Sequence, residues 1–138
     1  MNLQERIQAF NKLGGYLQTD LYKHSQEKMY LAEALNPWFT ETHIENALNV
    51  LCEQLTIDML TSWLNPYKLK EVVTPKKILV IMAGNIPLVG FHDFLTVLIS
   101  GHQVIIKMSS NDNVLLKVLI KQLLVIAPRF KQSIDFVD

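Results

Sequence analysis

A continuous run of β-branched and apolar residues at positions 77–82, KILVIM, constrains this chain more than any other feature. Runs of this kind are typical of strands that are buried on both faces of a parallel sheet. Parallel neighbours in a sheet need a crossover connection between them, and that connection is usually a helix. The run therefore predicts an α/β fold in which residues 77–82 form a central strand with both faces buried.

The sequence after this strand alternates in the way that a parallel sheet requires. Further elements are predicted in the order helix 87–100, strand 104–107, helix 113–127 and strand 133–137. Pro87 suits the first turn of the first helix and Gly101 its end, whereas Pro128 ends the second helix. The order β-α-β-α-β predicts part of a doubly wound parallel sheet, and its first strand should keep an unpaired edge.

The residues before the predicted sheet have a helical pattern instead. Residues 1–67 are predicted to form an amino-terminal helical region and residues 68–138 the sheet, with the boundary at Asn65-Pro66-Tyr67. Gly14-Gly15 interrupts the first helix of this region, because each glycine weakens a helix by about 1 kcal/mol relative to alanine. We therefore predict a kink or break in that helix.

A second helix is predicted from residue 21 to residue 35. It should end before Asn36-Pro37, because the residue that precedes a proline is pushed out of helical geometry. Trp38 and Phe39 follow at once, and we expect both side chains to anchor the corner.

Apolar residues at three- and four-residue spacing from 44 to 59 predict a third helix. A capping box at Thr42-His43-Ile44-Glu45 is expected to begin it. Cys52, the single cysteine of the chain, lies on the apolar face of this helix. We interpret it as a small buried hydrophobic residue rather than a catalytic thiol.

Composition excludes several classes of function. Thirteen Lys and Arg residues balance thirteen Asp and Glu residues without blocks of like charge, so nucleic acid and anionic membranes are not expected partners. No apolar run reaches the roughly 18 residues of a membrane span, and the first residues do not resemble an export signal. A single cysteine excludes an internal disulfide, and the histidines lack ligand spacing, so we predict a cytoplasmic protein without a metal site.

Polar residues that could carry chemistry follow the first two strands. In open α/β sheets, ligands bind beyond the carboxyl ends of the strands, which selects Gly84-Asn85-Ile86-Pro87 and Lys107-Met108-Ser109-Ser110. The amide of Asn85 could polarise a carbonyl group, or it could simply cap the next helix. Lys107 could bind ribose or phosphate, or it could be a solvated residue at a strand end. Gly84 and Gly90 fit neither a dinucleotide fingerprint nor a Walker sequence.

Taken together, two segments resemble a known family. Residues 81–95, IMAGNIPLVGFHDFL, and residues 100–110, SGHQVIIKMSS, are separated by one predicted helix. They look like the paired segments of acyl-CoA reductases related to the fatty-acid reductase of bacterial luminescence, within the aldehyde dehydrogenase superfamily. The resemblance covers residues 77–138, and the corner at residues 36–40 also resembles that family.

The resemblance implies roles for individual residues. Asn85 falls on the asparagine of the oxyanion hole, and Lys107 falls on the lysine that holds the adenosine ribose. Cofactor binding would also involve the backbone at the end of the first strand and the loop after the second, through Ile81, Met82, Ala83, Gly84, Ser109 and Ser110. Because Ser110 stands where NAD-preferring relatives often carry a glutamate, which would repel a 2′-phosphate, the expected cofactor is NADPH.

The implied reaction is the reduction of an acyl-CoA or acyl thioester to an aldehyde through a cysteine acyl-enzyme. In that family the nucleophile lies far downstream of these motifs, and Cys52 matches nothing catalytic. We therefore expect this chain to be an amino-terminal part that is inactive alone and that self-associates as a homo-oligomer. The alternative is a non-catalytic α/β module that binds another chain through its apolar sheet edge and helix. The reading frame beyond codon 138 would discriminate between the two.

Overall fold

The computed structural model describes residues 1–19, 26–71 and 73–138 of the chain. Its elements are α1 (Leu3–Thr19), α3 (Gln26–Leu35), α4 (Glu41–Gln54), α5 (Ile57–Leu64), η1 (Asn65–Tyr67), β1 (Lys77–Ile81), α6 (Phe91–Ile99), β2 (Gln103–Lys107), α7 (Leu115–Ile126), η2 (Pro128–Ser133) and β3 (Ile134–Val137). The strands form a parallel sheet in the order β1-β2-β3. Helices followed by a parallel sheet confirm the predicted α/β class.

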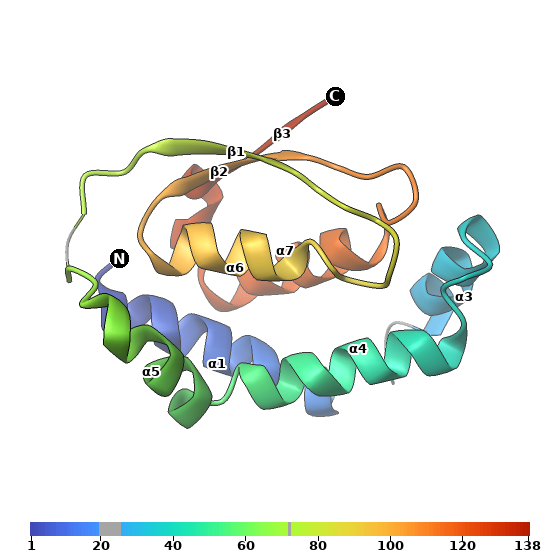
Figure 1. Cartoon of the computed structure of the whole chain (residues 1–138), viewed down its shortest axis with the longest axis horizontal. Helices are drawn as coiled ribbons and strands as arrows, with labels where there is room; N and C mark the ends of the chain where they lie inside the picture. Colours follow the sequence, from blue (N-terminus) through green and yellow to red (C-terminus); the bar gives the residue numbers. More distant parts are fainter. Residues whose placement is uncertain (20–25, 72) are drawn as a thin grey trace.

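The elements are stacked in layers, with the sheet on one side of the molecule (Figure 1). Helices α6 and α7 lie beneath the sheet, and α1, α4 and α5 lie beneath those two helices. Within the described chain, no helix covers the other face of the sheet. Leu79 and Ile81, which alternate with the half-buried Ile78 and Val80 along β1, are 57% and 71% exposed. The prediction that this strand is buried on both faces is therefore wrong, because helices pack against one face only.

An aromatic cluster joins the helical layers to the sheet half of the chain. Phe10 of α1 is fully buried and lies edge-on to Phe91 and Phe94 of α6, with ring centroids 6.5 and 6.4 Å apart. Phe130 of η2 packs on the same ring at 5.6 Å. These contacts belong to one continuous hydrophobic core that extends across the predicted boundary at residue 67.

Helix α1 continues through Gly14 and Gly15, so the predicted break is absent. A side chain at residue 14 would place its Cβ 2.8 Å from the Cβ of Leu55, whereas a Cβ at residue 15 would meet nothing. Gly14 therefore allows α1 to approach the end of α4 closely. The packing gained at this contact outweighs the weak helical preference of the two glycines.

The other amino-terminal helices follow the predictions in part. Helix α3 ends at Leu35, as predicted before Asn36-Pro37, while residues 21–25 of the predicted helix lie outside the described residues. Phe39 is fully buried at the corner, but Trp38 is 78% exposed and does not anchor it.

The region predicted as one helix from 44 to 59 is two helices. Thr40, rather than the predicted box at 42–45, caps α4 by accepting a hydrogen bond from the His43 N–H. The helix ends at Gln54, and Thr56 then caps α5 through the Met59 N–H. Threonine side chains favour such caps, because they accept hydrogen bonds from N–H groups that the helix leaves unpaired.

Candidate functional site

The carboxyl ends of β1 and β2 lie side by side. Ile81 pairs with Lys107 in the register of the two strands, and the Met82 N–H donates to the Lys107 carbonyl at 2.9 Å. The loops that follow also meet, because a Cβ on Gly84 would collide with Ser109. Asn85 directly follows Gly84 and therefore lies close to the polar residues that follow β2.

The two glycines of the loop after β1 serve close packing. Gly84 leaves room for Ser109, and a Cβ on Gly90 would collide with the sulfur of Met82. Gly90 is the N-cap of α6, which begins at Phe91, so Pro87 precedes the helix and does not occupy its first turn as predicted. Gly101 ends the helix as predicted, with a φ of 90°. Gly84 and Gly90 therefore have a packing role next to β1.

A buried carboxylate that the sequence did not single out supports the loop from behind. Asp112 is 6% exposed, and its Oδ2 accepts a hydrogen bond of 2.8 Å from the Leu88 N–H. Leu88 has a φ of 61°, in the left-handed region that a leucine rarely adopts. Burial raises the pKa of Asp112, while the hydrogen bond from Leu88 opposes that shift. Asp112 thus ties the loop after β2 to the loop that carries Asn85.

Asn85 is exposed and has no hydrogen bond to any residue that the structure describes. It does not cap α6, since the cap of that helix uses no side chain. It lines a hollow of about 470 Å³ between α4 and the loop after β1, whose wall is largely apolar and includes Val50, Leu51 and Ile86. Asn85 therefore borders an apolar space, and its side-chain N–H groups have no hydrogen-bond partner among the described residues.

Ser109 and Ser110 line a different hollow, of about 840 Å³, beside α7 and β3. Its floor is apolar, and lysines at 117, 121 and 131 stand around it with Asp138 as the acidic residue among its described lining. Lys117 and Lys121 were not predicted from the sequence as site residues. Their i, i+4 spacing places them on one face of α7, but solvated lysines on a helix show the same pattern.

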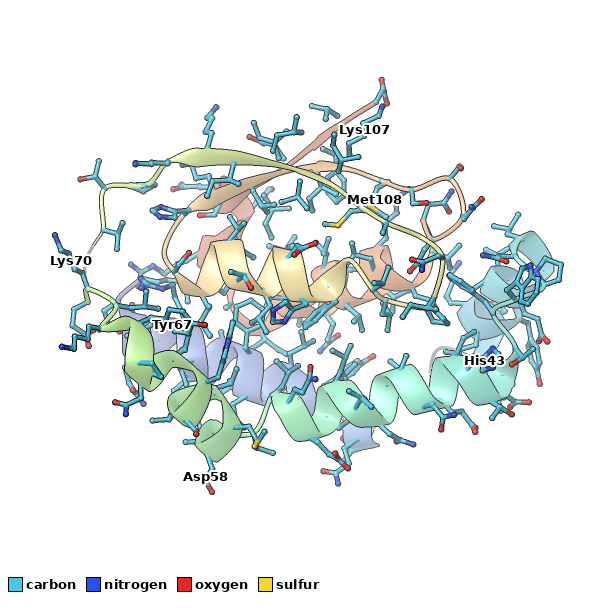
Figure 2. All side chains as sticks on the ribbon, viewed as in Figure 1. His43, Asp58, Tyr67, Lys70, Lys107 and Met108 are labelled. Carbon is cyan, nitrogen blue, oxygen red and sulfur yellow. The ribbon has the colours of Figure 1, made fainter. Side chains whose placement is uncertain are left out.

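The remaining predicted cofactor residues lie at the same rim but outside both hollows. Lys107 and Ile81 are exposed at the ends of their strands, and Figure 2 shows Lys107 on the sheet side, far from His43 of α4. Ala83 is exposed, while Met82 and Gly84 are buried. Among the described residues, none of positions 81–84 and 107 lines the hollow of Asn85 or that of Ser109. The predicted residues share one end of the sheet, and neither of these two hollows brings all of them together.

Cys52 stands apart from this rim, whereas two of the described histidines, His43 and His92, line the hollow of Asn85. Cys52 is half-buried on α4 and does not line the hollow of Asn85, and burial raises the pKa of its thiol. His92 lines that hollow but packs on the ring of Trp63, with centroids 5.4 Å apart. The described part of the chain contains no group of three or more His, Cys, Asp or Glu side chains able to hold a metal ion.

None of the described helices combines the length and apolar character needed to cross a bilayer. Comparison with curated proteins and with solved structures gives no match. A family model described as acyl-CoA reductase (LuxC) matches residues 10–137, which is nearly the whole chain and includes both segments after the strands. The chain therefore belongs to the LuxC acyl-CoA reductase family.

Proposed function

We propose that this chain supplies the carbonyl-polarising amide and part of the cofactor site of an enzyme that reduces a fatty acyl thioester to an aldehyde with NADPH. Membership in the family implies an oxidoreductase that acts on an acyl-CoA substrate, and it suggests a nicotinamide cofactor. The proposed role in carbonyl polarisation rests on the position of Asn85, which follows the carboxyl end of β1, has no hydrogen bond to a described residue and lines an apolar hollow.

The amide of Asn85 suits the charge that develops in acyl transfer. When a thiolate attacks a thioester, the carbonyl oxygen becomes an oxyanion, and a fixed N–H donor stabilises it. The donor acts more strongly where water is excluded, which the apolar wall around Asn85 favours. Asp112 contributes indirectly, because its bond to Leu88 holds the loop in which Asn85 lies.

The hollow of Asn85 also suits the acyl group. Its lining combines Trp38, Val50 and Ile86, which are exposed apolar side chains in the described structure, with Asn85 at one side. An alkyl chain that covers these side chains would remove apolar surface from water, at about 25 cal/mol per Å². We propose that the acyl chain lies along α4 with its carbonyl directed to Asn85.

The second hollow fits the adenosine end of NADPH. Apolar residues Ile120, Leu124 and Phe136 offer a surface for an adenine ring, and Lys117 and Lys121 offer charges for phosphates. Ser110 brings no carboxylate to repel a 2′-phosphate, although Asp138 stands at the same hollow. When bound, the cofactor would supply the hydride for reduction, while these residues hold its adenosine and phosphates and Lys107, which lies outside the hollow, binds the adenosine ribose.

The acyl-accepting thiol of this mechanism comes from outside residues 1–138. Cys52 is the only cysteine of the sequence, it does not line the hollow of Asn85, and its raised pKa disfavours the thiolate. We propose that residues 1–138 alone are inactive and that the active enzyme is a cytoplasmic homo-oligomer.

A non-catalytic binding module is the second candidate, and the exposed face of the sheet favours it. Leu79 and Ile81 are apolar and exposed there, and β1 pairs on one side only within the described sheet. Parallel sheets are normally covered on both faces, so a further protein surface should cover these residues. The two candidates differ in whether any acyl-CoA reduction occurs.

The test follows cofactor oxidation by the protein expressed from the complete reading frame, with a long-chain acyl-CoA as substrate. We expect oxidation of NADPH that requires acyl-CoA and is faster than oxidation of NADH. Ser110→Glu should lower the NADPH-to-NADH ratio of kcat/KM at least tenfold, because a carboxylate would repel the 2′-phosphate. Ser62→Glu, at an exposed serine of α5 that lines neither of these hollows nor the one beside Arg6, is the control. The absence of acyl-CoA-dependent oxidation would favour the binding module.

A further inference from the structure

A third hollow, of about 550 Å³, lies at the opposite end of the sheet from Asn85. It is lined by α1 through Arg6, by the turn before β2 through Gly101 and His102, and by η2 through Arg129 and Lys131. These segments meet where β2 and β3 begin, near the end marked N in Figure 1. Lys131 also lines the hollow beside α7, whereas the proposed reductase chemistry uses none of the other residues named here.

Arg6 is a buried charged side chain in the wall of this hollow. It is 3% exposed, its Nε donates to the Ile99 carbonyl at 2.8 Å, and its Nη1 donates to the Met1 carbonyl at 2.6 Å. The remaining nitrogen, Nη2, is buried without a hydrogen-bond partner in the described structure. A buried guanidinium group with an unpaired N–H is costly, unless a group of opposite charge lies nearby.

Carboxylates compensate this charge only in part. Glu71 and Glu5 attract Arg6, but burial lowers the pKa of the guanidinium against that attraction. Glu71 accepts a hydrogen bond from the Leu3 N–H at 3.3 Å, and Glu5 is bound to Arg129 at 3.0 Å. Among the described residues that line the hollow, none is an Asp or Glu.

The other walls of the hollow add donors. Arg129 and Lys131 bring two further cations. The Nδ1 atom of His102 accepts a hydrogen bond of 3.3 Å from the Lys76 N–H, so the neutral ring carries its proton on Nε2. Three cationic side chains and an imidazole donor thus surround one space without a lining carboxylate.

We propose that this hollow binds a phosphate group, either as free inorganic phosphate or as the phosphate of a larger organic molecule. A phosphate dianion accepts several charge-assisted hydrogen bonds at once, and guanidinium groups match it particularly well. A bound phosphate would compensate the charge of Arg6. It would also connect three segments that line the hollow, namely α1, η2 and the turn before β2. The site lies apart from the rim of Asn85, so it does not depend on the proposed reductase function.

The test is a titration followed by two-dimensional ¹H–¹⁵N NMR at constant ionic strength, held by sodium chloride. Inorganic phosphate is one probe, and adenosine monophosphate is the other. We expect saturable shifts of the Arg6 Nε–H signal and of the amides of Gly101, His102 and Ser133. Binding of the nucleotide at least tenfold tighter than inorganic phosphate assigns an organic phosphate, whereas equal or weaker binding assigns the free ion.

The double variant Arg129→Gln with Lys131→Gln should weaken binding at least tenfold while Arg6 and the fold are retained. Lys117→Gln is the matched control, because Lys117 lines the hollow beside α7 and not this one. The proposal is overturned if neither probe gives saturable shifts at these signals, or if the double variant binds as tightly as the unaltered protein.

Discussion

Two buried charged side chains, Asp112 and Arg6, hold opposite ends of α6 and differ in how well they are paired. Asp112 accepts one described hydrogen bond, from the Leu88 N–H just before the helix begins, whereas Arg6 donates two, one of them to the Ile99 carbonyl at the last residue of α6. The carboxylate stands near the amino end of the helix and the guanidinium at its carboxyl end, so each charge suits the helix dipole. Residues distant in sequence therefore position the helix that underlies the sheet.

The largest effect on stability is expected at Arg6. Arg6→Ala would leave the Ile99 and Met1 carbonyls without their charged donor and would remove a buried side chain, which costs about 3 kcal/mol in the free energy of unfolding. Arg129→Ala is the control, since its ion pair with Glu5 is exposed to solvent and should contribute far less to the free energy of unfolding. Urea unfolding monitored by circular dichroism measures both. Equal losses in the two variants would contradict the role of Arg6.

A smaller loss in the free energy of unfolding is expected when Asp112, near the amino end of α6, is replaced. Asp112→Ala leaves the Leu88 N–H buried and unpaired, which costs about 1–3 kcal/mol. Asp112→Asn keeps an oxygen that accepts this hydrogen bond and removes the buried charge, so it should cost less than Asp112→Ala. The same unfolding measurement compares them. A greater loss for the asparagine variant would show that the charge itself holds the loop.

The pH dependence of stability sharpens the same comparison. Burial raises the pKa of Asp112 above its ordinary value of 3.8, so the folded protein holds this proton more tightly than the unfolded chain. The resulting stabilisation is fully present below pH 3.8 and is lost as the pH rises through the folded pKa. We expect the unaltered protein to gain stability relative to Asp112→Asn as the pH falls toward 4. Urea unfolding of both proteins at several pH values would reveal the opposite slope if the shift had the other sign.

The smallest effects are expected at adjacent glycines of α1. Gly15→Ala should stabilise the protein by about 0.5–1 kcal/mol, because its Cβ would enter open space on a helix. Gly14→Ala should destabilise it by about 1 kcal/mol or more, because its Cβ would press on Leu55. Thermal unfolding of the pair tests the close contact between α1 and α4, and a stabilising Gly14→Ala would disprove it.

Local sequence signals predicted the sheet half of the fold well. The strands are observed at 77–81, 103–107 and 134–137, close to the predicted 77–82, 104–107 and 133–137, and Gly101 and Pro128 follow the helices between them as predicted. The errors arose where distant residues decide the structure. Gly14 tolerates no side chain because of Leu55, 41 positions away, and β1 is half exposed because helices cover one face of the sheet.

The location of the candidate site could be predicted from the sequence, but which residues share a hollow could not. The ends of parallel strands meet at one rim, so Asn85 and the residues after β2 could be placed together from their positions alone. Side-chain directions then assign Asn85 and Ser109 to different hollows, which no spacing reveals. Asp112 could not be singled out, because its partner is the backbone of Leu88 in a conformation without a sequence signature.

The most direct test of the central claim compares two asparagines that line the same hollow, Asn85 and Asn46 of α4. Steady-state reduction of a long-chain acyl-CoA by the protein from the complete reading frame gives kcat and KM for Asn85→Ala and Asn46→Ala. We predict that Asn85→Ala lowers kcat by about 10²–10³ with an unchanged melting temperature, because one oxyanion donor is lost, while Asn46→Ala stays within about threefold. A kcat for Asn85→Ala within threefold of the unaltered protein would contradict the claim.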